Sequence, residues 1–217
     1  MCGRFNLTAS PEQVMETFHL QRLPNYETSF NIPPGQKILS IVQLDDGSYK
    51  AVNLHWGLIP HWSKESKISS RLINARAETL PEKPAFRSAY QQRRCLIPTT
   101  GFYEWQKLEQ GKQAFFISRE DQQLFAFAGL WEYWEHRTKT IYSCTIITIA
   151  ANELMKPVHQ RMPVIIDKQH YSNWLDKQAL PEATQLLLTT DAYQGITLKP
   201  VSDWVNNPQH NDKKCLN

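Results

Sequence analysis

Five closely spaced runs rich in β-branched and aromatic residues constrain the fold of this chain more than any other feature. They cover residues 94–97, 102–108, 114–119, 124–134 and 140–150. Turn-forming sequences separate them, for example Glu109-Gln110-Gly111-Lys112. Strands that follow one another with short turns between them are typical of an antiparallel sheet. So many aromatic-rich strands predict that the sheet curls toward a barrel or two packed layers.

The remaining segments predict a hairpin and several short helices. Ser10-Pro11-Glu12-Gln13 has the form of an N-cap, a first-turn proline and a capping-box glutamine, so a helix is expected to about residue 20. The turn Asp45-Asp46-Gly47 joins predicted strands over 37–44 and 49–56. A further strand is expected over 162–166, and helices over 84–91, 152–156, 167–177 and 181–188.

These elements predict an α+β fold with one domain over residues 1–217. Its sheet is expected to be largely antiparallel and curled like a barrel, with a few peripheral helices. No internal repeat or Gly-, Ser- or Pro-rich linker divides the chain, and the sequence from about residue 208 to 217 is expected to be a polar C-terminal tail.

The composition excludes disorder and membrane spanning as the main states of the chain. Apolar residues make up 41% of the 217 residues and charged residues 21%, as in ordinary soluble domains. The longest apolar stretch, residues 144–151, is far shorter than the roughly 20 residues of a membrane span. No basic segment followed by an apolar run begins the chain, so no signal peptide is expected. These features predict a cytoplasmic protein without a membrane partner.

The four cysteines, Cys2, Cys95, Cys144 and Cys215, are widely separated, and none forms a Cys-x-x-Cys pair. No pair of histidines with zinc-ligand spacing lies beside them. The sequence therefore predicts reduced thiols, with no disulfide framework, no metal ion and no cofactor.

Positive charge is concentrated in one stretch of the chain. Between Ser63 and Arg94 there are eight basic residues and three acidic ones, a local excess of five in a chain whose net charge is +3. Such a concentration favours an anionic partner, with nucleic acid the leading candidate. On charge alone, a solvated basic surface is an equal alternative.

The second residue has the chemistry of an aldehyde trap. Removal of Met1 is expected because Cys2 is small, and it would place an α-amine of pKa about 8 beside a thiol of pKa about 8.5. The amine can form a Schiff base with an aldehyde, and the neighbouring thiol can then close a five-membered thiazolidine ring. An inert second residue is the alternative.

Three further positions have side chains suited to a reaction centre. Asn74 can donate and accept hydrogen bonds at once, and Arg76 beside it can hold a phosphate. Glu104 stands among Phe102, Tyr103 and Trp105, so burial would raise its pKa toward the range of a general acid. A turn-capping asparagine and a half-exposed strand glutamate are the alternatives.

His159 precedes Arg161 in an expected loop, which suits proton transfer near a phosphate-bearing substrate. A structural histidine is the alternative.

Taken together, these segments resemble the SRAP family, the SOS-response-associated peptidases or abasic-site processing proteins, over nearly the whole chain. The motifs that carry the resemblance are MCGRF (1–5), NIPPG (31–35), WGLIPHW (56–62), NARAET (74–79), RCLIP (94–98), GFYEW (101–105), HQRMP (159–163), PVS (200–202) and VNN (205–207).

The resemblance implies a monomeric protein that binds single-stranded DNA containing abasic sites and traps them as a thiazolidine, protecting them during the DNA damage response. It would associate with the nucleoid when bound to DNA. Cys2 resembles the nucleophile, Asn74 the residue that positions the sugar and the adduct, Glu104 the acid/base group, and His159 the second proton-transfer residue.

Four other residues resemble DNA contacts. Arg4, Arg76 and Arg161 are expected to hold phosphates. Trp62 is expected to stack on a base, a contact worth roughly 1–3 kcal/mol.

Three other functions remain open on the sequence. A thiol peptidase could use Cys2 with His159. A glutamine amidotransferase with an N-terminal nucleophile also begins Met-Cys-Gly, but the Asn-Gly and Gly-Asp pairs expected around its site are absent here. A single-strand DNA-binding module without chemistry is the alternative that is not an enzyme.

Overall fold

One of the two sheets closes on itself. The computed structural model describes residues 2–217, so the predicted removal of Met1 lies outside the described residues. In the closed sheet, β10 pairs with both β4 and β9, and β3 and β6 complete the ring. Its strands are β3 (Lys37–Gln43), β4 (Tyr49–Trp56), β6 (Arg94–Thr99), β9 (Phe125–His136) and β10 (Lys139–Ala150). Only the β4–β10 contact within this ring is parallel, so the strands form a largely antiparallel five-stranded barrel.

Short strands flank the end of β10. β5 (Asn74–Arg76) runs parallel to β10 with Asn74 opposite Ile146, and β11 (Arg161–Pro163) runs antiparallel with Arg161 opposite Ala150. The chain then changes partner, because β12 (Ile165–Ile166) pairs with β9. The strand predicted over 162–166 is therefore two strands.

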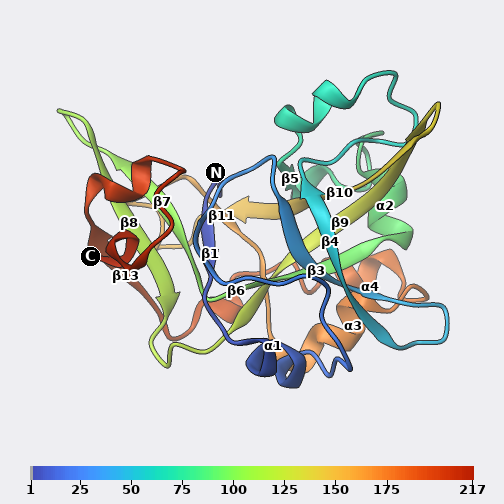
Figure 1. Cartoon of the computed structure of the whole chain (residues 1–217), viewed down its shortest axis with the longest axis horizontal. Helices are drawn as coiled ribbons and strands as arrows, with labels where there is room; N and C mark the ends of the chain where they lie inside the picture. The colour runs from blue at the N-terminus through green and yellow to red at the C-terminus, as the bar shows by residue number, and fades with distance from the viewer. Residues whose placement is uncertain (1) are drawn as a thin grey trace.

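The second sheet has five antiparallel strands and includes the N-terminal segment (Figure 1). Its order is β13 (Ile196–Val201), β8 (Lys112–Arg119), β7 (Gly101–Lys107), β1 (Phe5–Leu7) and β2 (Ser29–Ile32). A Cβ atom on Gly101 would lie 2.3 Å from the Phe116 ring, so this position needs glycine for β7 and β8 to approach.

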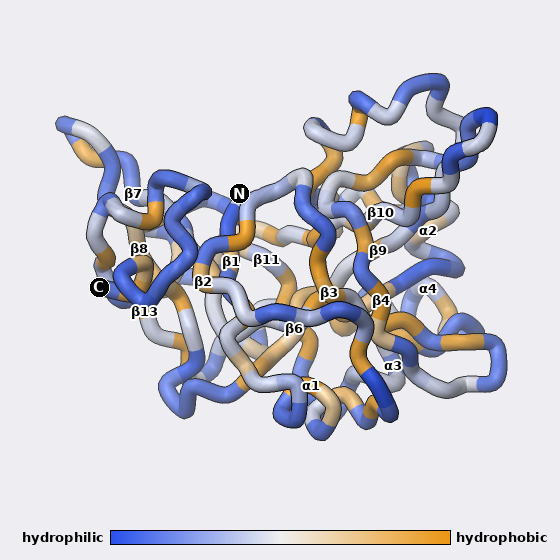
Figure 2. Tube along the Cα trace, viewed as in Figure 1, coloured by the Kyte–Doolittle hydropathy of each residue, from blue (hydrophilic) through white to orange (hydrophobic). Residues whose placement is uncertain are grey.

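The main core fills the barrel and the space between the sheets. Apolar segments gather in the strands and polar segments in the outer loops (Figure 2). Phe127 is central, with T-shaped contacts to Phe5, Phe102 and Phe125 at 5.7–6.0 Å between ring centroids. Phe127 lies on β9 of the barrel, whereas Phe5 and Phe102 lie on β1 and β7, so these contacts pack the second sheet against the barrel.

Four short α-helices lie at the periphery, namely α1 (Pro11–Thr17), α2 (Arg87–Gln92), α3 (Tyr171–Leu175) and α4 (Pro181–Gln185). The predicted capping box is present, since the Ser10 hydroxyl accepts from the Gln13 N–H and the Gln13 side chain accepts from the Ser10 N–H. The helix ends earlier than predicted. The described residues contain no helix long and apolar enough to cross a membrane.

One helix prediction, over 152–156, is wrong. Residues 153–158 form turns instead, because Pro157 follows Lys156 at once and disfavours the helical conformation of the residue before it. The helix predicted over 167–177 is present but shorter. A 3₁₀ helix, Lys168–His170, without a side-chain cap from Asp167 leads into α3, and α3 ends at Leu175, where the buried Arg94 donates to the carbonyls of Trp174 and Asp176.

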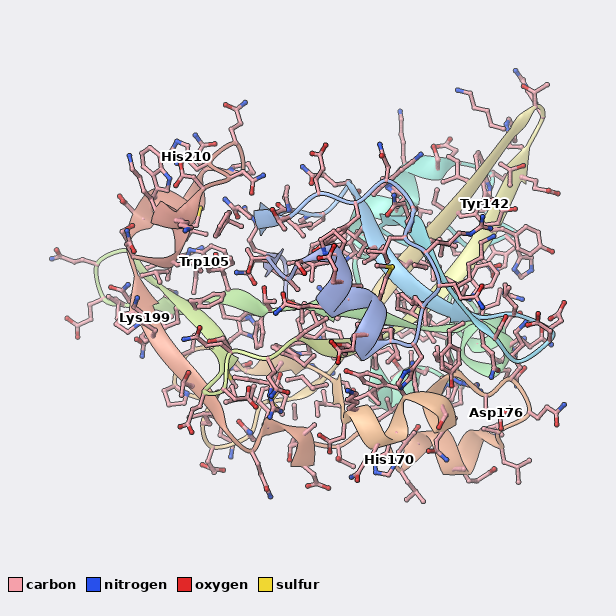
Figure 3. All side chains as sticks on the ribbon, turned by 60° about the horizontal axis from the view of Figure 1, so that its bottom comes forward. Trp105, Tyr142, His170, Asp176, Lys199 and His210 are labelled. Atoms are coloured by element: carbon pink, nitrogen blue, oxygen red, sulfur yellow. The ribbon has the colours of Figure 1, made fainter. Side chains whose placement is uncertain are left out.

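The predicted fold class, α+β with a curled and largely antiparallel sheet, is confirmed. Residues 208–217, the expected tail, pack on the second sheet through a 3₁₀ helix (Lys213–Leu216) with Cys215 fully buried. The Asn31 amide donates to the His210 carbonyl at 2.8 Å. Figure 3 shows His210 and Trp105 at one end of the molecule and Tyr142 at the other.

Candidate active site

Strand pairing places the Cys2 segment beside Glu104. Phe5 lies opposite Phe102 in the antiparallel β1–β7 pair, and the Tyr103 N–H donates to the Arg4 carbonyl at 2.9 Å. In an antiparallel pair, each residue later on β7 lies opposite a residue earlier in the N-terminal segment. Glu104 therefore lies opposite Gly3, the residue that follows Cys2.

Asn74 meets the same segment from the other sheet. Its side-chain Nδ2 donates to the Cys2 carbonyl oxygen at 3.0 Å. Its Oδ1 atom is buried and has no hydrogen-bond donor among residues 2–217. A buried acceptor of this kind beside a nucleophile is suited to a donor on a bound substrate.

Glu104 is buried on β7, with 3% of its surface exposed. Burial raises the pKa of its carboxyl above the ordinary value, and the nearby His159 ring opposes that rise. The half-exposed alternative is therefore excluded. A buried carboxyl whose pKa is raised can donate a proton near neutral pH.

The Cys2 thiol is fully buried in the same place. Burial raises the pKa of this thiol well above its ordinary value, and the Glu104 carboxylate raises it further. The backbone N–H of Arg4 acts in the opposite direction. The thiol therefore keeps its proton in this environment.

His159 is oriented by its own loop. Its Nδ1 lies 2.9 Å from the backbone N of Arg161 and 3.0 Å from the Arg161 carbonyl oxygen, and these contacts orient the ring. The His159 N–H donates to the Met155 carbonyl at 2.9 Å and closes the turn. The structure thus brings together Cys2, Asn74, Glu104 and His159 from four separate segments.

Tyr193 is a member of this region that the sequence reasoning missed. It is buried, and its hydroxyl donates to the Pro163 carbonyl at 2.7 Å, which anchors the end of the segment that carries His159. Burial raises the pKa of its phenol, and the charges of Cys2 and Glu104 raise it further, which places the ring near both. No local pattern in the sequence marks this residue.

The four predicted DNA contacts differ in accessibility. The Arg76 side chain is exposed and makes no hydrogen bond or ion pair within the described residues. Trp62 is 52% exposed, although its indole N–H donates to the Pro84 carbonyl at 3.3 Å. Both side chains are accessible to a ligand.

Arg4 and Arg161 already have partners in the protein. The Arg4 guanidinium donates to the Asn31 side chain and to the Val205 carbonyl at 2.8 and 2.9 Å. Arg161 forms a two-pronged ion pair with Glu78 at 2.6 and 3.0 Å. A phosphate would have to compete with these groups.

The sequence overestimated the surface charge of the stretch from Ser63 to Arg94. Arg94 is buried and donates to backbone carbonyls of Tyr90, Gln91, Trp174 and Asp176. Arg93 pairs with the buried Glu132 at 2.9 Å. The other six basic side chains are exposed, and so are the three acidic ones, so the surface excess of positive charge is smaller than predicted.

The part of the chain from residue 2 onward holds no cluster of three or more His, Cys, Asp or Glu side chains that could bind a metal ion. Its four cysteines are free and buried.

Known proteins resemble this chain over its full length. A family model described as SOS response associated peptidase (SRAP) matches residues 1–208. The abasic site processing protein YoaM of Bacillus subtilis is 42% identical over 223 residues, covering 100% of this chain and 97% of that protein. The abasic site processing protein HMCES of Xenopus tropicalis is 31% identical over 261 residues, covering 100% of this chain and 78% of that protein.

A solved structure from Bacteroides thetaiotaomicron has the same fold, with a TM-score of 0.87, 23% identity and coverage of 99% of this chain and 98% of that one. Since the family model covers nearly all of the sequence, this chain belongs to the SRAP family.

Proposed function

We propose that this protein binds single-stranded DNA and traps abasic sites covalently through Cys2 after Met1 has been removed. The main support for the proposal is that two side chains meet at Cys2. The Asn74 amide is hydrogen-bonded to Cys2, and the buried Glu104 carboxyl lies close to its thiol. The relatives named abasic site processing proteins support the choice of substrate.

The first step is opening of the abasic deoxyribose, which is mostly a closed hemiacetal. Glu104 gives its proton to the ring oxygen as the bond from that oxygen to C1 breaks, and the C1 hydroxyl loses its proton to His159 or water. The raised pKa of Glu104 suits this role because the carboxyl must carry a proton beforehand. The product is a free aldehyde at C1.

The Cys2 amine then attacks C1 and forms a carbinolamine. A proton supplied through Glu104 or His159 allows water to leave, which gives an imine. The Cys2 sulfur adds to the same carbon, and the thiol proton passes to the imine nitrogen. One water is released overall, and the product is a five-membered thiazolidine.

Asn74 has the geometry to hold the nucleophile and the sugar together. Its amide N–H holds the Cys2 carbonyl, and its buried Oδ1 can accept from a sugar hydroxyl or from the Cys2 amine. Exposed Arg76 can bind a flanking phosphate and exposed Trp62 can stack on a base. A single strand suits this site because no duplex stacking has to be broken to expose the sugar.

Denaturing electrophoresis tests the proposal. The protein is mixed with single-stranded DNA carrying one abasic site, and a slow band that survives denaturation is expected. Cys2→Ala should give no such band while still binding undamaged single strands. Cys144→Ala, which removes another buried thiol, should crosslink like the wild type.

A form with an extra residue before Cys2 has no α-amine at that cysteine and should not crosslink. Efficient crosslinking by that form or by Cys2→Ala would overturn the mechanism. Amide hydrolysis that depends on Cys2, without any crosslink, would favour a peptidase instead.

A further inference from the structure

Both terminal nitrogens of the Arg161 guanidinium are bound by groups of the protein itself. Its Nη1 and Nη2 atoms bind the two carboxylate oxygens of Glu78 at 2.6 and 3.0 Å. Nη2 also donates to the carbonyl and the hydroxyl of Thr148. Its Nε atom is buried and has no acceptor among the described residues. The two-pronged face of Arg161 is therefore taken by a carboxylate.

The pair lies beside the candidate active site. Arg161 begins β11, and Glu78 belongs to the 3₁₀ helix Ala77–Thr79 that directly follows β5. These strands flank the same end of β10, where Thr148 lies opposite both Arg76 and Pro163. The ion pair thus connects the segment that carries Asn74 with the segment that carries His159.

A carboxylate and a phosphate compete for the same donors of an arginine, because each offers two oxygens to the planar fork. The Arg161 side chain is 16% exposed and that of Glu78 is 51% exposed. Because Glu78 is exposed, solvent screens this pair, and its contribution to the free energy is expected to be about 1 kcal/mol. A DNA phosphate can therefore displace Glu78, but the binding free energy is reduced by the pair that is lost.

We propose that Glu78 is a competitor for the Arg161 phosphate site and that it lowers the affinity of the protein for single-stranded DNA. This inference rests on the proposed function, since it assumes that a strand passes the Cys2 site. Arg76, which is exposed and has no such partner in the described chain, is then the phosphate contact available before any rearrangement. The lowered pKa of Glu78, caused first by its hydrogen bond to Arg161, keeps the competitor ionised at neutral pH.

Binding of undamaged single-stranded oligothymidine, measured by fluorescence anisotropy over a series of salt concentrations, tests the competition. Glu78→Gln should bind about fivefold more tightly than wild type at low salt. The slope of log affinity against log salt should become steeper by about 0.7, the value for one further phosphate contact on a single strand. Glu82→Gln removes one exposed charge nearby without touching Arg161, so it should change affinity by less than about twofold.

A double-mutant cycle assigns the effect to the pair. In an Arg161→Gln background, Glu78→Gln should raise the affinity by less than about twofold, because the competed donor is gone and only the weaker interaction of Glu78 with the charge of Arg76 remains. Glu78→Asp keeps the charge but is too short for the two-pronged pair, and it should give an intermediate affinity.

The proposal is overturned if Glu78→Gln weakens binding, which would mean that Glu78 positions Arg161 for DNA, or if affinity and slope match those of Glu82→Gln. Those outcomes leave the proposed function intact as long as the wild type binds the strand and crosslinks abasic DNA. Absence of strand binding by the wild type would overturn both this inference and the single-strand part of the proposed function.

Discussion

Glu104 and Glu132 are two buried carboxylates in very similar sequence settings. Glu104 lies in the segment Phe-Tyr-Glu-Trp on β7, and Glu132 lies in Trp-Glu-Tyr-Trp on β9. Their exposed fractions are 3% and 2%. Aromatic neighbours flank the carboxyl in both segments, and both carboxyls are buried.

Their partners differ. Glu132 accepts from Arg93 at 2.9 Å and from the Tyr133 N–H at 3.0 Å, and it lies 3.2 Å from the His61 Nδ1 atom. These groups hold the Glu132 side chain where β9 pairs with β10, with Glu132 opposite Ser143. Glu104 instead lies beside a thiol and an imidazole, and burial raises its pKa.

The comparison shows that burial alone does not identify a catalytic carboxyl. A carboxylate buried against a guanidinium has a structural role, because removal of either partner leaves a buried charge without its counter-charge and destabilises the fold. A carboxyl whose neighbours can themselves exchange protons or form covalent bonds is suited to chemistry. The two glutamates should therefore respond differently to the same substitution.

The largest expected effect is on chemistry. Glu104→Gln should slow crosslinking to abasic single-stranded DNA by about 1,000-fold, because the amide cannot supply a proton. Binding of undamaged strands should stay within about twofold, since Glu104 is not placed to contact phosphate. Single-turnover crosslinking followed on denaturing gels gives the rate, and a rate within tenfold of wild type would remove Glu104 from the mechanism.

Glu132→Gln should have the opposite profile. Removing one partner of a buried ion pair leaves Arg93 without its counter-charge, so the free energy of unfolding should fall by about 3 kcal/mol. Denaturant unfolding measures this loss, and crosslinking by the folded variant should remain within a few-fold of wild type. Crosslinking rates of the variant and of wild type should be compared at low temperature, where the destabilised variant stays folded. A stable variant that cannot crosslink would reverse the roles assigned to the two glutamates.

The pH dependence of the free energy of unfolding gives a separate test of Glu104. The folded protein holds the Glu104 proton more tightly than the unfolded chain, so protonation of Glu104 favours folding. This contribution is present below the unfolded-state pKa of about 4.3 and is lost as the pH rises through the folded-state pKa. The free energy of unfolding of Glu104→Gln, minus that of wild type, should therefore increase from acid to neutral pH. A difference that stays constant or decreases would contradict the raised pKa.

The smallest effect is expected for His61, one of the groups that contact Glu132. His61 is half exposed, and Arg93 and the Tyr133 N–H remain when it is removed. His61→Ala should reduce the free energy of unfolding by less than about 1 kcal/mol and leave crosslinking unchanged. A loss as large as that of Glu132→Gln would show that His61, rather than Arg93, fixes the carboxylate.

Local signals in the sequence predicted much of the fold. The hairpin of β3 and β4 was predicted because a turn with Gly47 separates two regular strands, and the cap of α1 because Ser10 and Gln13 have capping-box spacing. Strands β1, β2, β5 and β13 were missed. Each is short or polar and is held by partners far along the chain, so no local periodicity marks it.

The candidate site was predictable in its residues but not in its interactions. The motifs brought Cys2, Asn74, Glu104 and His159 to attention, whereas nothing local distinguished Glu104 from Glu132. Glu78, the two-pronged partner of Arg161, is 83 positions away in the sequence. The buried Arg94 donates to a carbonyl near the end of α3, which is also far away along the chain. Such long-range pairing follows from the fold and cannot be read from residue types.

The most direct measurement of the central claim is the mass of the adduct after its free thiols have been alkylated under denaturing conditions. The chain has four free cysteines. A thiazolidine blocks the sulfur of Cys2, so the adduct should carry three alkyl groups on a protein that lacks Met1. Apart from these alkyl groups, its mass should be that of protein plus DNA less one water. Four alkyl groups on the adduct, or an adduct that retains Met1, would contradict trapping by the Cys2 amine and thiol together.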